Sequence, residues 1–467
     1  MPKTRSKKSE YEINSLENNE FYKELVSLAV PVGLQNLLFA LIGATDALML
    51  GRLTQDSVAA VSLANQIVFI MSLFTGTIVG SGSTLIAQYW GKGDKTMAKN
   101  IFCMVLKWTV AISLVFFALA NFIPETLMRI YTSDNNLVHI GSSYLRIVSF
   151  SYLFSSISQC YYMLIKIEGK AYKGVIISLT ILIADIIIDL FLIYGLGGMP
   201  KLGANGSAYS TVIVELLGMV WYIIESHKKD SIHVDVAGFN WSSHVITRDL
   251  LKISLPMLGS ALAWELGTSM HSLIMGHLGT DAVAAASIAA IIMELATCVC
   301  IGVSTGAEII IGKLLGQNLF DKAKKYGRKF CHISFYVGGI NNLILFIIGP
   351  IAVYFFVLTD TARHYLIMML LFMIPYLFAF SINAIIVVGV FVAGGDTIYD
   401  AISVILASWC FALPLALLGT FVFEWPVMLV YILMCSDEII KLPWVYPRYK
   451  KYIWLRNLTH DNDAKIA

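Results

Sequence analysis

Charged side chains are scarce in this sequence of 467 residues: they make up 14% of it, whereas apolar residues make up 57%. A soluble domain carries about a quarter charged residues. So few charges leave much of the molecular surface without polar cover, which excludes an ordinary water-soluble protein. Apolar runs of roughly 20 residues or more recur along the chain, and that is the length of helix that crosses a bilayer. The composition therefore predicts an integral membrane protein.

Sequence motifs of several function classes are also absent. The chain has no GxxxxGK[ST] loop, so we do not predict ATP as the direct energy source. HExxH and Cys/His metal spacings are lacking, which argues against an enzyme, a bound metal or a cofactor. The seven cysteines include no CxxC pair and are expected to be small buried thiols. Basic loops are explained by membrane topology, so no nucleic-acid partner is predicted.

Apolar segments divide the chain into predicted membrane spans. Backbone groups in lipid must bond within their own segment, so these spans are predicted to be helices. The polar residues 1–24 look like a disordered tail, and the first span is too long for the apolar region of a signal peptide. We expect twelve spans, near residues 25–50, 58–83, 99–121, 141–163, 172–195, 206–225, 249–275, 283–311, 326–357, 363–392, 397–421 and 424–446.

The distribution of Lys and Arg predicts the orientation. If the spans alternate in direction, one side collects 27 of these residues, six of them from Lys441 onward, and the other side collects four. Cytoplasmic loops carry the excess of basic residues, so both termini are predicted to be cytoplasmic. The predicted organisation comprises an N-terminal tail (1–24), an N-terminal six-helix lobe (25–225), a linker (226–248), a C-terminal six-helix lobe (249–446) and a C-terminal tail (447–467).

An internal repeat relates the two halves. With a constant offset of 225 and no gap, residues 46–64 align with residues 271–289 at nine identical positions of nineteen. The same offset pairs Pro31 with Pro256 and Gly91 with Gly316. Six spans per half give both halves the same polarity. The sequence therefore predicts two parallel six-helix repeats around a central cavity, related by a pseudo-two-fold axis along the membrane normal.

Three aspartates lie within predicted spans of the N-terminal half. Asp185 and Asp189 are four residues apart and share one helical face, and Asp46 lies in the first span. An ionisable residue at membrane depth is costly unless it faces a cavity or a partner. Three carboxylates in one cavity are stable only if a cation joins them or at least one of them holds a proton at neutral pH. That is the chemistry that a Na⁺ or H⁺ coupling site requires.

Several segments resemble the multidrug and toxic compound extrusion (MATE) family, in particular its NorM and DinF branches. They are LAVPVGLQNLLFALIGATDALMLGRL at 28–53, GSGSTLIAQYWGKGD at 80–94, DIIIDLFLIYGLGGMPKLGANGSAYST at 185–211 and VAGGDT at 392–397. The resemblance covers about residues 20–445. It implies a plasma-membrane antiporter, with no resident cofactor, that exports amphipathic and mostly cationic drugs in exchange for Na⁺ or H⁺. We expect a monomer in contact with membrane lipid.

The resemblance also assigns site residues. Asp46 and Asp189 match the family's first-helix and fifth-helix aspartates, Asp185 stands where the family pattern usually has asparagine, and Thr211 lies near its sixth-helix threonine. In the C-terminal half, Glu265 resembles the seventh-helix glutamate of the NorM branch.

Other residues complete this prediction. Asn383 stands where the NorM branch has a tenth-helix aspartate, and His271 replaces Asp46 in the repeat and is able to titrate near neutrality. We expect Glu265, Asn383 and His271 to contribute to cation or substrate recognition. Pro31 matches the proline at which the family's first helix bends, and Pro256 is its repeat partner.

Two alternatives remain at this level. The first is a flippase for lipid-linked oligosaccharides from the same wider superfamily, which usually has fourteen spans and would favour a cavity rich in Arg and Lys. The second is a channel or membrane scaffold. The twelve spans and the mostly acidic buried charge favour the antiporter.

Overall fold

The computed structural model describes residues 3–228, 238–239, 241–356 and 358–460, and it is almost entirely helical. The N-terminal lobe comprises α1 (Lys3–Gly51), α2 (Gln55–Lys92), α3 (Lys95–Phe122), the short α4 (Pro124–Arg129), α5 (Asn135–Ile167), α6 (Tyr172–Tyr194), the turn η1 (Leu196–Gly198) and α7 (Ala204–Ser226). The C-terminal lobe comprises α9 (His244–Leu278), α10 (Thr280–Gly316), α11 (Phe320–Phe355), α12 (Asp360–Asn383) with its π-helical extension η2 (Ala384–Phe391), α13 (Thr397–Val404), the π-helical η3 (Ile405–Ala412), α14 (Leu413–Phe421), α15 (Val427–Met434) and α16 (Asp437–Lys450).

These helices form twelve membrane-length segments, six in each lobe. Within the described residues, nine are long and apolar enough to cross a membrane by length and composition. The other three are α5, α9 and the interrupted pair α15–α16, which carry more polar residues or are broken in the middle. The predicted all-α, two-lobe architecture with twelve spans is confirmed.

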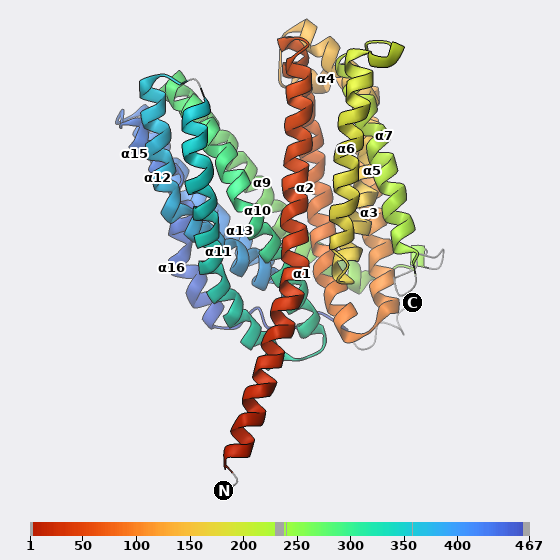
Figure 1. Cartoon of the computed structure of the whole chain (residues 1–467), viewed down its shortest axis with the longest axis vertical. Coiled ribbons are helices and arrows are strands. Elements are labelled where there is room, and N and C mark those ends of the chain that lie inside the picture. The colour runs from red at the N-terminus through yellow and green to blue at the C-terminus, as the bar shows by residue number, and fades with distance from the viewer. Residues whose placement is uncertain (1–2, 229–237, 240, 357, 461–467) are drawn as a thin grey trace.

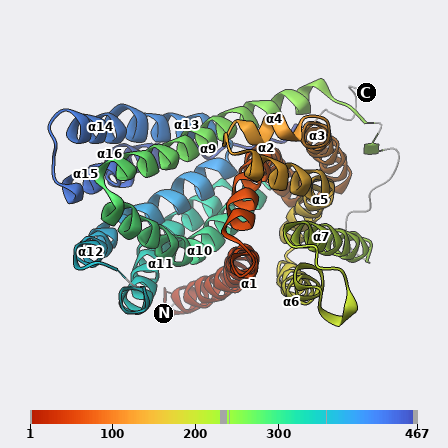
Figure 2. The same ribbon diagram turned by 90° about the horizontal axis from the view of Figure 1, so that it is seen from above.

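The two lobes diverge at one end of the molecule and converge at the other. In Figure 1, α9–α16 and α3–α7 stand apart at the top, and the helices approach each other at the bottom, near the α2–α3 and α10–α11 turns. Seen from above, α1 and α2 lie between the rest of the two bundles (Figure 2). Helix α1 packs along α10 of the opposite lobe, and α2 packs along α9 and α10. We call the two ends the diverging end and the converging end.

Local sequence signals fix both ends of α2 and the start of α3. Thr54 caps α2 by accepting a hydrogen bond from the backbone N–H of Ser57, and Gly93 ends the helix in a left-handed conformation. Asp94 then caps α3 by accepting from the N–H of Met97. Side-chain oxygens at these positions bond to N–H groups that have no partner within the helix, and glycine adopts the left-handed conformation without strain.

Two glycines of the repeat make the lobes touch at the converging end. A Cβ at Gly91 would lie 2.1 Å from the carbonyl oxygen of Lys313, and a Cβ at Gly316 would lie 1.8 Å from the carbonyl oxygen of Gln88. Both Gly91–Gly316 and Gln88–Lys313 are pairs at the repeat offset of 225. The crossing of α2 and α10 therefore obeys the pseudo-two-fold symmetry that the sequence predicts.

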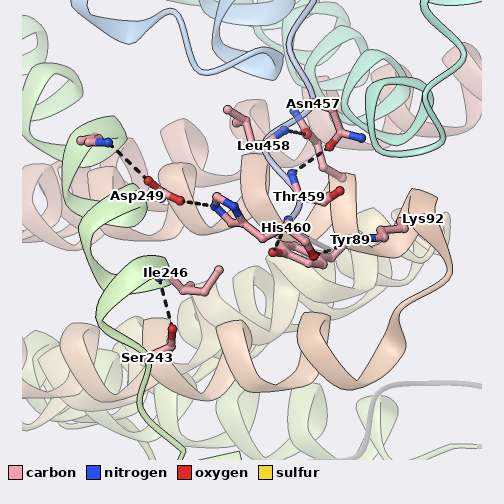
Figure 3. Close-up of polar contacts among 11 residues, drawn as sticks. Tyr89, Lys92, Ser243, Ile246, Asp249, Asn457, Leu458, Thr459 and His460 are labelled. Atoms are coloured by element: carbon pink, nitrogen blue, oxygen red, sulfur yellow. Dashed lines mark hydrogen bonds and ion pairs between the residues drawn. The ribbon is translucent and has the colours of Figure 1, made fainter. Parts of the chain in front are cut away.

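The segment after α16 crosses the converging end and contacts both lobes. We call residues 452–460 the C-terminal strap. Gln88 of α2 accepts a hydrogen bond from the Leu458 N–H at 2.7 Å and donates to the Ala393 carbonyl at 2.8 Å. The His460 N–H donates to the Tyr89 hydroxyl at 3.0 Å, and its ring Nε2 lies 2.7 Å from Asp249 Oδ2 (Figure 3). The strap thus ties α2 of one lobe to α9 of the other.

The N-terminal segment differs from the sequence prediction. Residues 3–24, predicted as a disordered tail, continue α1 as one helix to Gly51. Two ion pairs hold the C-terminal turns of this segment against the other lobe. Glu17 lies 2.5 Å from Lys325 of α11, and Glu24 lies 3.4 Å from Lys313 of α10. Parts of the predicted linker and C-terminal tail, 229–237, 240 and 461–467, lie outside the described residues.

Candidate functional site

Three aspartates converge between α1 and α6, as the sequence predicts. The carboxylates of Asp46, Asp185 and Asp189 each place one oxygen within 4.8 Å of the other two. Asp185 and Asp189 lie one helical turn apart on α6, and Asp46 reaches them from the upper part of α1. The side chains of Asp185 and Asp189 are 2% and 0% exposed. We call these residues the aspartate trio.

The protein itself supplies few hydrogen-bond donors to the trio. The hydroxyl of Ser210 on α7 donates to Asp185 Oδ1 at 2.9 Å. Asp46 Oδ1 and both carboxylate oxygens of Asp189 are buried and have no hydrogen-bond partner in the described part of the chain. Buried carboxylates without donors or counter-charges are strongly unfavourable. The trio therefore suits a bound cation or bound protons.

The structure distinguishes Thr211 from its neighbour Ser210. The Thr211 hydroxyl donates to the carbonyl of Ser207 in its own helix at 3.0 Å, whereas Ser210 reaches the trio. Successive helical residues point about 100° apart, so the rotation of α7 decides which hydroxyl faces Asp185. Sequence reasoning missed Ser210. The short connection between α6 and α7 indicates that the helices are neighbours but not their rotation.

Glu265 lies opposite the trio across the molecule's central cavity. A cavity of about 440 Å³ is lined by Asp46 from α1, by polar residues of α2 including Asn65 and Gln66, and by Glu265 from α9 of the other lobe. Asp46 is therefore both a member of the trio and part of the cavity wall. Glu265 and Asp46 bring carboxyl groups from two lobes to one space, which favours a positively charged ligand.

Asn383 and His271 occupy different places in the C-terminal lobe. The Asn383 amide donates to the Glu438 backbone carbonyl at 2.8 Å and to Glu438 Oε2 at 2.7 Å, so it belongs to a buried polar group at α16. His271 lines a second cavity within the C-terminal lobe. The structure does not bring Asn383 or His271 to the aspartate trio, and their predicted roles in recognition stay predictions.

The two repeat prolines lie inside long helices that join the lobes. Pro31 interrupts the hydrogen bonding of α1, and Pro256 does the same in α9. Leu28 and Ala29, just before Pro31, belong to the same buried cluster as Cys300 of α10. Pro31 thus lies where α1 packs on the opposite lobe, and Asp46 lies four turns further along the same helix.

Comparison with known proteins gives the same family match in both halves of the chain. The profile of the MatE family matches residues 31–191 and again residues 256–418, so the two matches begin at the repeat prolines. An uncharacterised transporter of Bacillus subtilis, YisQ, is 23% identical over 439 residues, covering 92% of this chain and 95% of the relative. A probable multidrug resistance protein NorM of Agrobacterium fabrum is 28% identical over 307 residues, covering 64% of each chain.

The fold has a solved counterpart as well. A MOP superfamily transporter from Pyrococcus furiosus, described as having a binding pocket of reverse polarity, superimposes with a TM-score of 0.82 at 18% identity. The match covers 92% of this chain and 96% of that one. At this identity the likeness establishes the two-lobe fold, and the chemistry must be argued from the residues of this chain.

Proposed function

Because this chain belongs to the MatE family of membrane transporters, we propose that it exports amphipathic, mostly cationic small molecules in exchange for Na⁺ or H⁺. The observation that carries the proposal is the aspartate trio, with oxygens within 4.8 Å of one another and no basic partner in the part of the chain that the structure describes. Multidrug resistance proteins among the relatives support the substrate class.

The trio supplies the ion-coupling chemistry. Three carboxylates that cannot all stay ionised without a counter-charge bind a cation or protons, and they release them when another positive charge takes their place. Asp185 is oriented by Ser210, while Asp46 and Asp189 keep oxygens free for the ion.

Asp46 links ion and substrate binding. Since it belongs to the trio and to the wall of the central cavity, a cationic substrate in that cavity competes with the coupling ion for the same negative charge. Competition of this kind produces exchange, because each ligand raises the free energy of the other's bound state. Glu265 on the opposite wall adds to the attraction of the cavity for a cationic substrate.

The proline in α1 provides a place for the conformational step. Pro31 removes one helical hydrogen bond where α1 contacts α10. A change of charge at Asp46 alters the packing of the same helix, and bending at Pro31 transmits it to the contact between lobes. We place the converging end, with both termini, in the cytoplasm of a plasma-membrane protein, because it carries the basic loops. The transporter functions as a monomer in lipid and has no resident cofactor.

Efflux from proteoliposomes tests the proposal. Purified protein is reconstituted, an organic cation is loaded, and Na⁺ and pH gradients are imposed one at a time. One of the two gradients should drive efflux, Asp46→Asn should abolish it, and Glu265→Gln should retain coupling with weaker substrate binding. Efflux that responds to neither gradient would refute the antiporter. Coupling that is lost in Glu265→Gln but kept in Asp46→Asn would move the ion site to the C-terminal lobe.

A further inference from the structure

A second cavity lies wholly inside the C-terminal lobe, apart from the central cavity. It has a volume of about 300 Å³ and is bordered by α9, α10, α12, η3, α15 and the start of α16. Three aromatic side chains (Trp264, Tyr376 and Tyr431) and four methionines line it, with a single carboxylate, Asp437. Aromatic faces attract organic cations, and methionine adapts to ligands of different shape.

The helix that crosses the membrane last is broken at this cavity. Helix α15 ends at Met434 and α16 begins at Asp437, and Met434, Cys435 and Asp437 all line the cavity. Interrupted helices at membrane depth occur where they line a cavity, and they often form binding sites in transporters.

The charges next to the cavity are not balanced. Lys441 lies 2.5 Å from Glu438 Oε1, and Asn383 donates to the other Glu438 oxygen, so Glu438 is fully paired. Asp437 is 4% exposed, and its Oδ1 accepts from the Glu438 N–H at 2.8 Å. It has no ion pair within 4.0 Å in the described part of the chain, and Lys441 attracts it only from a longer distance. Asp400 lies close enough to interact electrostatically with Lys441 and Glu438, but it does not line the cavity.

Lys441 connects the ion pair to the cavity wall. Its side chain is 5% exposed, and its ammonium group lies 5.4 Å from the centre of the Trp264 ring. The ring Nε2 of His271, which also lines the cavity, is buried and has no hydrogen-bond partner among the described residues. The cavity therefore offers one unpaired carboxylate, one free polar nitrogen and an aromatic and methionine lining.

We propose that this cavity is a second binding site, for a monovalent organic cation whose charge pairs with Asp437, and that Lys441 restricts the site to one positive charge by neutralising Glu438. A ligand with one positive charge pairs with the one carboxylate that lines the cavity. A dication meets the repulsion of the buried ammonium group. The inference deepens the proposed export function, on which it rests for the route by which the cation arrives and leaves.

Equilibrium binding to purified protein tests the site without any ion gradient. The probe is radiolabelled tetraphenylphosphonium, a permanent monocation, and the background is Asp46→Asn with Glu265→Gln, which removes the carboxylates of the central cavity. This background should still bind the probe, and Asp437→Asn should weaken that binding tenfold or more. Asp360→Asn, which removes an exposed carboxylate at the start of α12, is the matched control and should bind like the background.

The role of Lys441 is tested with methyl viologen, a permanent dication. Lys441→Met should improve binding of methyl viologen relative to tetraphenylphosphonium at least tenfold. If that variant does not fold, the double variant Lys441→Met with Glu438→Gln removes both charges of the pair and should bind the monocation as the background does.

The outcomes separate this inference from the proposed function. Probe binding that is insensitive to Asp437→Asn overturns the second site, whatever the efflux assay shows. Suppose that Asp437→Asn loses probe binding and that the protein transports under neither gradient. The second binding site is then supported, and the antiport function is refuted. An unchanged preference between the two probes in Lys441→Met overturns the charge restriction alone.

Discussion

Removing one charge from the aspartate trio should weaken cation binding without unfolding the protein. The change is Asp189→Asn, which keeps the shape of the side chain and one oxygen ligand. Three atoms no more than 4.8 Å apart all lie within about 2.8 Å of a common point (4.8 Å divided by the square root of three). That is near the roughly 2.3–2.6 Å at which Ca²⁺, a cation of similar size to Na⁺, contacts oxygen. A cation at that point would therefore contact all three carboxylates at once.

The magnitude follows from the charge that is lost. At an effective dielectric constant of about 20, two unit charges about 4 Å apart interact by roughly 4 kcal/mol. The asparagine carbonyl retains part of this attraction, and two carboxylates remain. We therefore expect a net loss of about 2–3 kcal/mol, which is roughly 30- to 150-fold in the dissociation constant.

Radioactive ²²Na⁺ binding to purified protein measures this change, and Thr211→Val is the matched control because its hydroxyl bonds to its own helix. If H⁺ is the coupling ion, Asp189→Asn should release one proton fewer when an organic cation binds, as read with a pH dye in weak buffer. Unchanged Na⁺ binding together with unchanged proton release in Asp189→Asn would refute the reasoning. So would a Thr211→Val variant as impaired as Asp189→Asn.

Three further changes test the contacts between lobes. Pro31→Ala restores a helical hydrogen bond and should slow turnover while leaving cation affinity unchanged; full transport would remove Pro31 from the mechanism. Gly316→Ala places a methyl group against the Gln88 backbone, so the protein should lose about 1–3 kcal/mol of stability, the usual cost of overpacking, measured as a lower melting temperature. Gln88→Ala removes hydrogen bonds to Leu458 and Ala393, and spin labels on α2 and α9 should then report a wider converging end; an unchanged distance distribution would show that the strap does not hold the lobes.

The sequence predicts the two-lobe fold well because the two halves of the chain repeat the same six-helix pattern. The nine identities between residues 46–64 and 271–289 and the paired prolines lie where the two halves need the same backbone. The trio was also predictable, because carboxylates are rare in apolar segments and the four-residue spacing of Asp185 and Asp189 fixes a shared face. The structure brings these residues together as expected, and their role in coupling stays a prediction.

The sequence did not predict contacts that depend on the rotation of a helix about its axis or on an interruption within a membrane-spanning helix. Choosing Ser210 over Thr211 requires the rotation of α7, which neighbouring residue types do not encode. Counting basic residues assigns Lys441 to the C-terminal side of the last span, whereas the break between α15 and α16 leaves it buried beside Glu438. The contact between Asn383 and Glu438 joins residues 55 apart and leaves no local pattern.

The glycine crossing at the converging end has a consequence for the origin of the chain. Gly91 meets Lys313 and Gly316 meets Gln88, so each partner of one contact is the repeat counterpart of a partner in the other. Between two separate six-helix subunits the same arrangement would be an isologous interface, in which one surface recognises a copy of itself. A half-length ancestor with this surface would have assembled as a parallel homodimer before its gene was duplicated and fused. Fusion would have allowed the halves to differ, as they now do: the positions of Asp46, Asp185 and Asp189 correspond to His271, Cys410 and Pro414 in the other half.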